Sequence, residues 1–283
     1  LEEAIRVTEI GQKMEGPQSA LIEYLVGMGI KSIGIREAIN IIQTTKLLNN
    51  ELLPYYAQLE KFKQNEEGLE KILKGDYQMF SWIIDQAVKG ITDGQHIPLR
   101  GLESLNPSEV KYLQKHSYFF EPNNTKKIYA EETRKQLKNV EKPCGQISKP
   151  NRKYLTPRNS FIKFMLTENV IGKILRDVTF VSFDGIFPKK CQEDFLVSTA
   201  QTLIAIKAYH NDTNAFPNSL TELVPKYLSK VPEDPFSGGQ LRYSKDKKII
   251  YSVGLNLTDV GGSNSKDWNS LYQDDDPTIK IDF

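Results

Sequence analysis

The chain has little of what defines several common functional classes. Only two cysteines and three histidines occur in 283 residues, too few for a disulfide scaffold and without the spacing of zinc ligands. The longest apolar stretch, residues 20–42, is interrupted by Glu23, Lys31, Arg36 and Glu37, so it predicts a buried helix rather than a membrane span. Lys and Arg (37) nearly balance Asp and Glu (36), leaving a net charge of +1. That balance argues against a nucleic-acid partner.

Recognisable catalytic motifs are missing as well. The sequence holds no Gly-X-Ser-X-Gly elbow, no P-loop, no dinucleotide-binding glycine pattern and no His-Glu-X-X-His helix. His210 follows an apolar helical stripe, and we expect it to complement the helix dipole or cap carbonyls there. These observations favour a non-enzymatic protein, while a pair of carboxylates assembled from distant positions stays open.

Helical periodicity dominates the first half of the chain. Apolar residues at three-to-four spacing predict helices over 21–42, 52–62 and 66–89, with Trp82 in the core. Further helices are expected at 110–116, where Asn106-Pro107 is a typical helix start, and at 118–142. Proline and glycine then cluster in residues 143–160, the best candidate for a linker.

A different pattern follows the linker. Helices are expected over 160–176 and from Pro188 to Tyr209, the second with one narrow apolar stripe that packs through a single face. Ser219–Tyr227 predicts a short helix with a capping box. Alternating residues at 241–243 and 249–253 predict a hairpin, and 278–283 a third strand. The fold class expected is α+β, with a helical domain over 1–150 and an α+β domain over 151–283.

Several short motifs in the last third of the chain occur in a recognisable order. They are Tyr209, Phe216-Pro217, Val224-Pro225-Lys226-Tyr227-Leu228, Asp234-Pro235, Leu241-Arg242-Tyr243 and Tyr251-Ser252-Val253-Gly254. This order resembles the C-terminal half of the major pseudopilins of bacterial type II secretion systems. It is closer still to uncharacterised exported bacterial proteins that carry such a module behind a helical region. The resemblance implies a long helix packed on a small antiparallel sheet, and an extracytoplasmic location in the periplasm or at the cell surface.

The chain departs from the pseudopilin pattern at its beginning. No hydrophobic N-terminal segment matches the one through which pseudopilins are anchored, and the helix of the module lies far into the chain. The chain also starts at Leu1 without a methionine. We therefore expect a processed or cut N-terminus and a preceding segment that associates the full-length protein with a membrane.

The resemblance also implies a calcium-binding loop. Major pseudopilins bind Ca²⁺ in the loop after the Ser-X-Gly strand, which corresponds here to residues 255–277. Carboxylates and carbonyls in a loop supply the six to eight oxygens that Ca²⁺ prefers. The expected ligands are Asp259, Asp274 and Asp275, followed by Asp267. The alternative is that these acids are turn formers and exposed charges.

The two cysteines, Cys144 and Cys191, leave two alternatives open. In an oxidising compartment they can pair, and the resemblance to exported proteins favours this. Otherwise they are two independent thiols.

Together these patterns predict a non-enzymatic structural or protein-interaction component of the bacterial cell envelope, bound to a protein partner or a larger assembly. One alternative is an envelope hydrolase with its site between the two halves. Another, a pseudopilin proper, requires a prepilin-type leader before Leu1.

Overall fold

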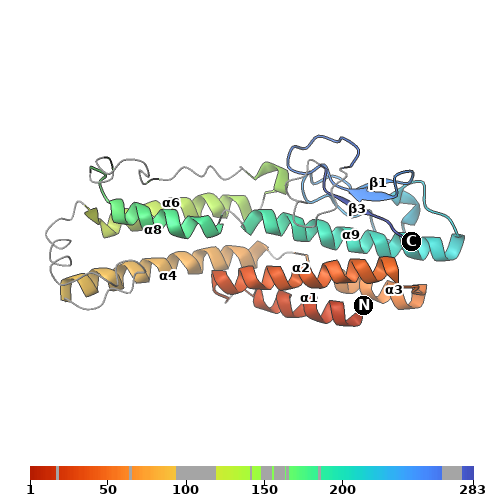
Figure 1. Ribbon diagram of the computed structural model, residues 1–283, viewed down its shortest axis with the longest axis horizontal. Coiled ribbons are helices and arrows are strands. Elements are labelled where there is room, and N and C mark those ends of the chain that lie inside the picture. The colour runs from red at the N-terminus through yellow and green to blue at the C-terminus, as the bar shows by residue number, and fades with distance from the viewer. Residues whose placement is uncertain are drawn as a thin grey trace. The chain divides into compact units, whose positions relative to one another are not determined.

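The computed structural model describes residues 1–16, 19–63, 66–93, 119–140, 142–147, 155, 163, 166–183, 186–262 and 276–283. The α-helices are α1 (Glu2–Met14), α2 (Leu21–Thr44), α3 (Asn49–Glu60), α4 (Glu66–Asp93), α6 (Pro122–Val140), α8 (Val170–Phe183) and α9 (Ile186–Thr213). Two 3₁₀ helices, η2 (Cys144–Gln146) and η3 (Leu220–Leu223), and three strands, β1 (Arg242–Ser244), β2 (Ile249–Tyr251) and β3 (Thr278–Lys280), complete the described elements (Figure 1). The α+β class is therefore confirmed. The helix expected at 110–116 lies outside the described residues.

The chain forms two compact units, each built from separated segments. Unit 1 comprises residues 1–68, 142–147 and 186–283, and unit 2 comprises residues 69–141 and 148–185. These units group the chain differently from a division near residue 150, because the first three helices share unit 1 with the last 98 residues. A domain boundary near residue 150 stays a prediction.

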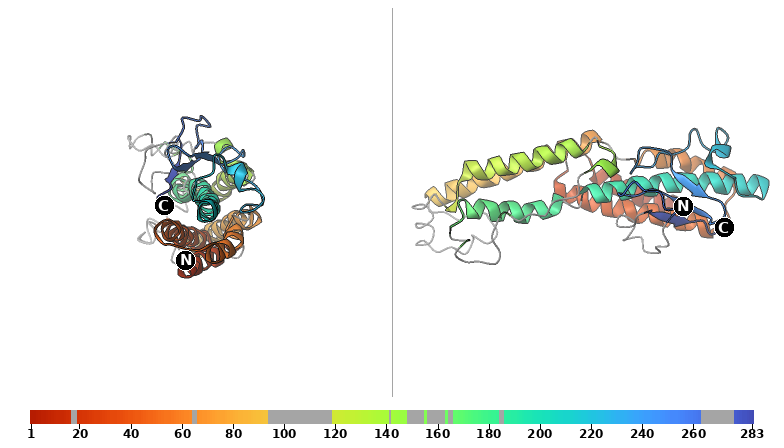
Figure 2. Two further views of the ribbon diagram at one scale, coloured as in Figure 1. Left: turned by 90° about the vertical axis from the view of Figure 1, so that its right-hand side faces the viewer. Right: turned by 90° about the horizontal axis from the view of Figure 1, so that it is seen from above.

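Helix α9 is the centre of unit 1. Helices α2 and α3 pack on one side of it and the small sheet lies on the other (Figures 1 and 2). The expectation of a single buried stripe on this helix is wrong, because nearly every side chain from Cys191 to Ala208 is buried or half-buried. Its polar residues are accommodated individually: the Gln201 amide donates to Glu60 at 2.6 Å, and the Lys207 ammonium donates to the carbonyls of Ile42 and Thr45. The helix is therefore covered on both sides within one core.

The sheet is antiparallel, in the order β1-β2-β3. Ile250 of β2 lies opposite Tyr243 on one side and Ile279 on the other, and its side chain is fully buried in the core. The predicted hairpin and third strand are both present, although each strand is only three residues long.

The predicted helix after Phe216-Pro217 is shorter than expected. Only the single 3₁₀ turn η3 forms, and Ser219 makes no side-chain capping bond to it. Glu222 instead accepts the backbone N–H of Asn218 at 3.0 Å. The capping-box prediction is therefore wrong: Glu222 binds the N–H of Asn218 and not that of the predicted cap, Ser219.

Helix α1 was not expected from periodicity, and glycine explains how it packs. A Cβ atom on Gly27 would lie 2.7 Å from the Gly11 carbonyl oxygen, and one on Gly34 would lie 2.8 Å from the Ala4 carbonyl oxygen. Helices α1 and α2 run antiparallel, and their backbones approach so closely at these two positions that no residue larger than glycine fits there. The buried residues of α1 are Ala4, Ile5, Thr8 and Gly11. Only Ile5 is a large apolar residue, which is why apolar spacing did not predict this helix.

Unit 2 contains most of α4 together with α6 and α8. Tyr129 of α6 stacks on Phe80 of α4 with ring centroids 3.8 Å apart, and its hydroxyl donates to Asp76 at 2.5 Å. Burial raises the pKa of Asp76, and the Tyr129 hydrogen bond opposes that rise. The Asn169 side chain joins α6 to the start of α8 by accepting the Glu121 N–H at 2.8 Å.

Candidate functional site

The loop expected to bind calcium is described only at its two ends. Asp267, Asp274 and Asp275 lie outside the described residues. Asp259 is described: one carboxylate oxygen accepts Arg242 Nε at 2.8 Å and the other accepts the Gly261 N–H at 3.0 Å. Partial burial opposes but does not outweigh these bonds, which lower the pKa of Asp259. Both of its oxygens are thus engaged by groups of the chain itself.

The buried carboxylate of this loop is Asp276, which was not among the expected ligands. Its Oδ2 accepts the N–H groups of Val260 at 2.9 Å and Gly262 at 2.8 Å. Its Oδ1 is buried and has no hydrogen-bond partner among the described residues. Gly261 and Gly262 have φ of +82° and +89°, a backbone that only glycine adopts without strain, so the turn that presents these N–H groups needs both. The sequence signal was the run of three aspartates, of which Asp276 is the last.

No complete metal site is visible at this loop or elsewhere in the described part of the chain. Within the ranges that the structure describes, no three His, Cys, Asp or Glu side chains come together in a way that could hold a metal ion. Of the four expected ligands only Asp259 is described, so the calcium site stays a prediction.

A second buried carboxylate, Asp234, organises the Asp-Pro turn. Its Oδ1 accepts the Phe236 N–H at 2.9 Å and the Ser252 hydroxyl at 2.5 Å. Its Oδ2 accepts the Ser237 hydroxyl at 3.0 Å, the Val253 N–H at 3.3 Å and Arg242 Nη1 at 3.4 Å. This carboxylate joins the turn to the end of β2 and, through Arg242, to Asp259.

Cys144 and Cys191 form a disulfide, with Cα atoms 5.8 Å apart. Cys191 lies in α9, and Cys144 opens η2, whose backbone is bound to the Asp-Pro turn. The N–H of Cys144 donates to the Pro235 carbonyl at 3.1 Å, and the N–H of Gly145 donates to the Phe236 carbonyl at 2.8 Å. The disulfide therefore fixes a short segment between the central helix and the turn that Asp234 organises.

A buried charge cluster joins three helices of unit 1. Lys31 of α2 lies 2.6 Å from Glu15, the residue that caps the C-terminus of α1, and 3.0 Å from Glu193 of α9, and all three side chains are at most 3% exposed. The Ser32 hydroxyl also donates to Glu193 at 3.1 Å. Burial opposes the charge on Lys31, but the two glutamates raise its pKa; burial raises the pKa of Glu15, and Lys31 opposes that rise. The cluster ties α1 and α2 to the central helix.

Large apolar side chains are exposed on both units. On α2, Ile22, Val26 and Ile33 are 67%, 45% and 62% exposed and share one helical face with Gly29, around which there is open space. On α4, Trp82 is 60% exposed, so the expectation that it lies in the core is wrong. Within the described ranges, no helix is both long and apolar enough to cross a membrane.

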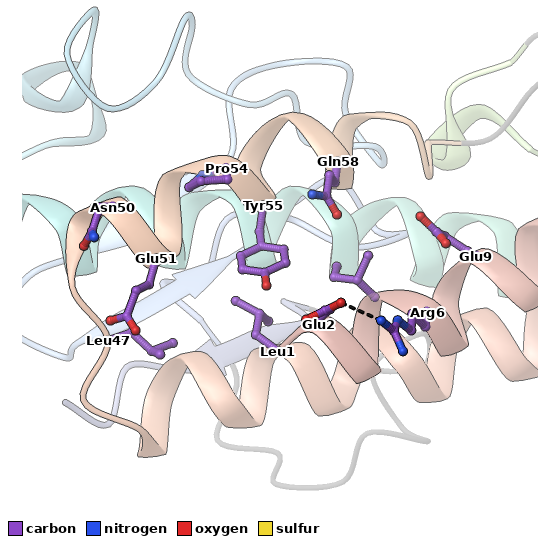
Figure 3. Close-up of a pocket in the computed structure, with 11 residues that line it drawn as sticks. Leu1, Glu2, Arg6, Glu9, Leu47, Asn50, Glu51, Pro54, Tyr55 and Gln58 are labelled. Carbon is purple, nitrogen blue, oxygen red and sulfur yellow. Dashed lines mark hydrogen bonds and ion pairs between the residues drawn. The ribbon is translucent and has the colours of Figure 1, made fainter.

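A groove of about 610 Å³ separates α1 from α3 in unit 1. Ile5, Leu47 and Tyr55 supply apolar surface, and acidic residues lie along its edges. Figure 3 shows the Tyr55 ring projecting from α3 towards α1, and Arg6 bound to Glu2 across one turn of α1. Apolar periodicity did not predict this groove, because one wall is a helix that periodicity missed and the other is a helix that begins 35 residues after the first one ends.

His210 lies in the last turn of α9, as expected, but its environment differs from the one predicted. Its ring packs edge-on against Phe216, with centroids 4.9 Å apart. Burial, and then Lys248 and Lys207, lower the pKa of His210. Both effects oppose a positive charge on the imidazole, so they weaken the interaction that a His210 cation would make with the helix dipole.

Comparison with known proteins found no matching family model, no matching curated protein and no matching solved structure.

Proposed function

We propose that this protein is an extracytoplasmic, non-enzymatic interaction component of a bacterial cell envelope. The observation that carries the proposal is the disulfide between Cys144 and Cys191. Disulfides persist in the periplasm and at the cell surface, whereas the cytosol of mesophiles keeps thiols reduced. The order of residues from Tyr209 to Gly254, with its resemblance to pseudopilins and related exported proteins, supports the same compartment.

The interaction role is supported by the exposed apolar face of α2. A large exposed apolar patch on a folded protein typically marks a surface that another molecule covers. Ile22, Val26 and Ile33 recur on one face of a helix whose other faces already pack against α1 and α9. Association of the protein with a membrane belongs to the same proposal.

Calcium is proposed as a stabilising ion of the loop between β2 and β3. The support is the Oδ1 oxygen of Asp276, which is buried and lacks a hydrogen-bond partner among described residues. Leaving a buried carboxylate oxygen unsatisfied costs about 1–3 kcal/mol or more, and a hard cation would satisfy it. Asp274, Asp275 and Asp267 are the candidates to complete the site, whereas Asp259 is engaged by Arg242.

The compartment is tested by the oxidation state of the cysteines in the organism that makes the protein. Cells are quenched in acid, and the denatured protein is treated with a maleimide that adds a visible mass to each free thiol. The proposal expects no added mass before reduction, two added masses after reduction, and recovery of the protein outside the cytoplasmic fraction. A Cys144→Ser variant, which gains one mass without reduction, controls for the labelling. Two free thiols in the untreated wild-type protein would contradict the proposed compartment.

A further inference from the structure

We propose that the groove between α1 and α3 binds a short basic and apolar segment of a partner protein. This inference rests on the proposed interaction role and names the chemical class of the partner. The groove lies wholly within unit 1 and has a volume of about 610 Å³. This is within the range of specific pockets, which span roughly 300–1,000 Å³.

The two walls of the groove have a regular helical origin. On α1, Glu2, Arg6 and Glu9 recur at four- and three-residue spacing and so lie on one face. Seven residues of helix extend about 10 Å, which matches three or four residues of an extended peptide at about 3.3 Å each. A short segment rather than a whole domain therefore fits this groove.

The charge of the walls selects a basic segment. The charged side chains of the lining are the carboxylates of Glu2, Glu9 and Glu51 and the guanidinium of Arg6, a formal side-chain balance of −2 from three negative groups and one positive. The positive group is already held, because Arg6 binds Glu2 at 2.6 Å and Glu3 at 3.1 Å. Among the described residues, the Glu51 carboxylate accepts one hydrogen bond, from the Leu48 N–H at 2.8 Å, and the Glu9 carboxylate forms none. Glu9 and Glu51 are therefore the groups available to a lysine or arginine.

The floor of the groove favours a partner segment that has an apolar side chain between its lysine or arginine residues. Ile5 is buried at the base, and Leu47 and Tyr55 are half-buried beside it. A side chain that covers them removes apolar area from water, while its charged neighbours reach the acidic edges. Complementary charge on this scale directs partner choice and association rate more than raw affinity.

The experiment measures fluorescence anisotropy of three end-blocked, dye-labelled pentapeptides with the intact chain in low salt. The probes are Lys-Leu-Lys-Leu-Lys, the charge-matched Lys-Ser-Lys-Ser-Lys and the charge-reversed Glu-Leu-Glu-Leu-Glu. We expect saturable binding of the first alone, weakened as salt is raised because exposed charges are screened. Glu9→Lys should weaken it by about tenfold, equivalent to about 1.4 kcal/mol. Glu37→Lys, on the exposed side of α2, should leave it unchanged.

Three results would overturn the groove as a binding site. They are equal binding of the serine peptide, an equal effect of Glu9→Lys and Glu37→Lys, and no binding of the leucine–lysine peptide in low salt. Both substituted positions are exposed, so we expect each variant to keep the fold. Thermal unfolding of each variant checks this. None of these results bears on the cysteine oxidation state, so failure of the groove and failure of the proposed compartment are separate outcomes.

Discussion

Asp234 and Asp276 are both fully buried carboxylates in turns of the same small module, yet they are satisfied to different degrees. Asp234 accepts five hydrogen bonds, divided between its two oxygens. Asp276 accepts two, both at Oδ2, and its Oδ1 has no partner in the described part of the chain. A buried carboxylate whose bonds come from its own chain is structural, whereas one with an open oxygen can take a ligand.

Lys31 resembles Asp234, because its buried charged group is also satisfied by residues of the chain itself. Its ammonium lies between Glu15 and Glu193, so the buried charge is compensated within the fold. Buried pairs of this kind are costly to break, because removal of one partner leaves the others uncompensated. Both sites should therefore respond to mutation and not to calcium.

The largest effect is expected from Asp234→Ala. The substitution leaves five donors without their acceptor, of which all but the exposed Ser237 are buried or half-buried. It should lower the free energy of unfolding by about 3–5 kcal/mol. Urea unfolding measures the loss, with Asp246→Ala in the exposed β1–β2 turn as the matched control. A loss below about 1 kcal/mol would remove the structural role assigned to Asp234.

Lys31→Met should cost somewhat less, about 3 kcal/mol at neutral pH. It leaves Glu15 and Glu193 buried with no cation between them, which raises their pKa in the folded protein above the unfolded value. Stability of the variant is then lost as pH rises through the folded pKa values, and it recovers in acid. Unfolding of wild type and variant from pH 4.5 to 8 tests this, with Lys74→Met at an exposed position of α4 as the control. A pH-independent difference would contradict the prediction.

A smaller effect is expected at His210. Its folded pKa is lowered from 6.5 by burial and by Lys248 and Lys207, so the unfolded chain binds the proton more readily. This contribution to stability is present above the unfolded pKa and is lost as pH falls from that value through the lower folded pKa. His210→Gln should therefore flatten the change in Tm between pH 7.5 and 5.5. An unchanged slope would show that other groups cause the acid sensitivity.

Much of the helical content and the small sheet could be predicted from apolar spacing and turn dipeptides. Helix α1 could not, because it packs through glycine contacts and a buried ion cluster rather than through an apolar stripe. The surroundings of α9 were also misjudged, since polar residues such as Gln201 and Lys207 are buried there by partners distant in sequence. For the loop, composition indicated acids, but only the fold distinguishes Asp276, which is buried, from Asp259, which is paired with Arg242.

The difference between Asp234 and Asp276 is tested most directly by thermal unfolding in millimolar Ca²⁺ and in chelator. A ligand that binds only the folded state raises Tm, and at 100 times its dissociation constant it stabilises by about 2.7 kcal/mol. We predict a rise in Tm for the wild type and for the control Asp246→Asn, and none for Asp276→Asn, which keeps an acceptor oxygen but loses the charge. No rise in the wild type, or an equal rise in Asp276→Asn, would contradict the assignment of the open oxygen to a cation.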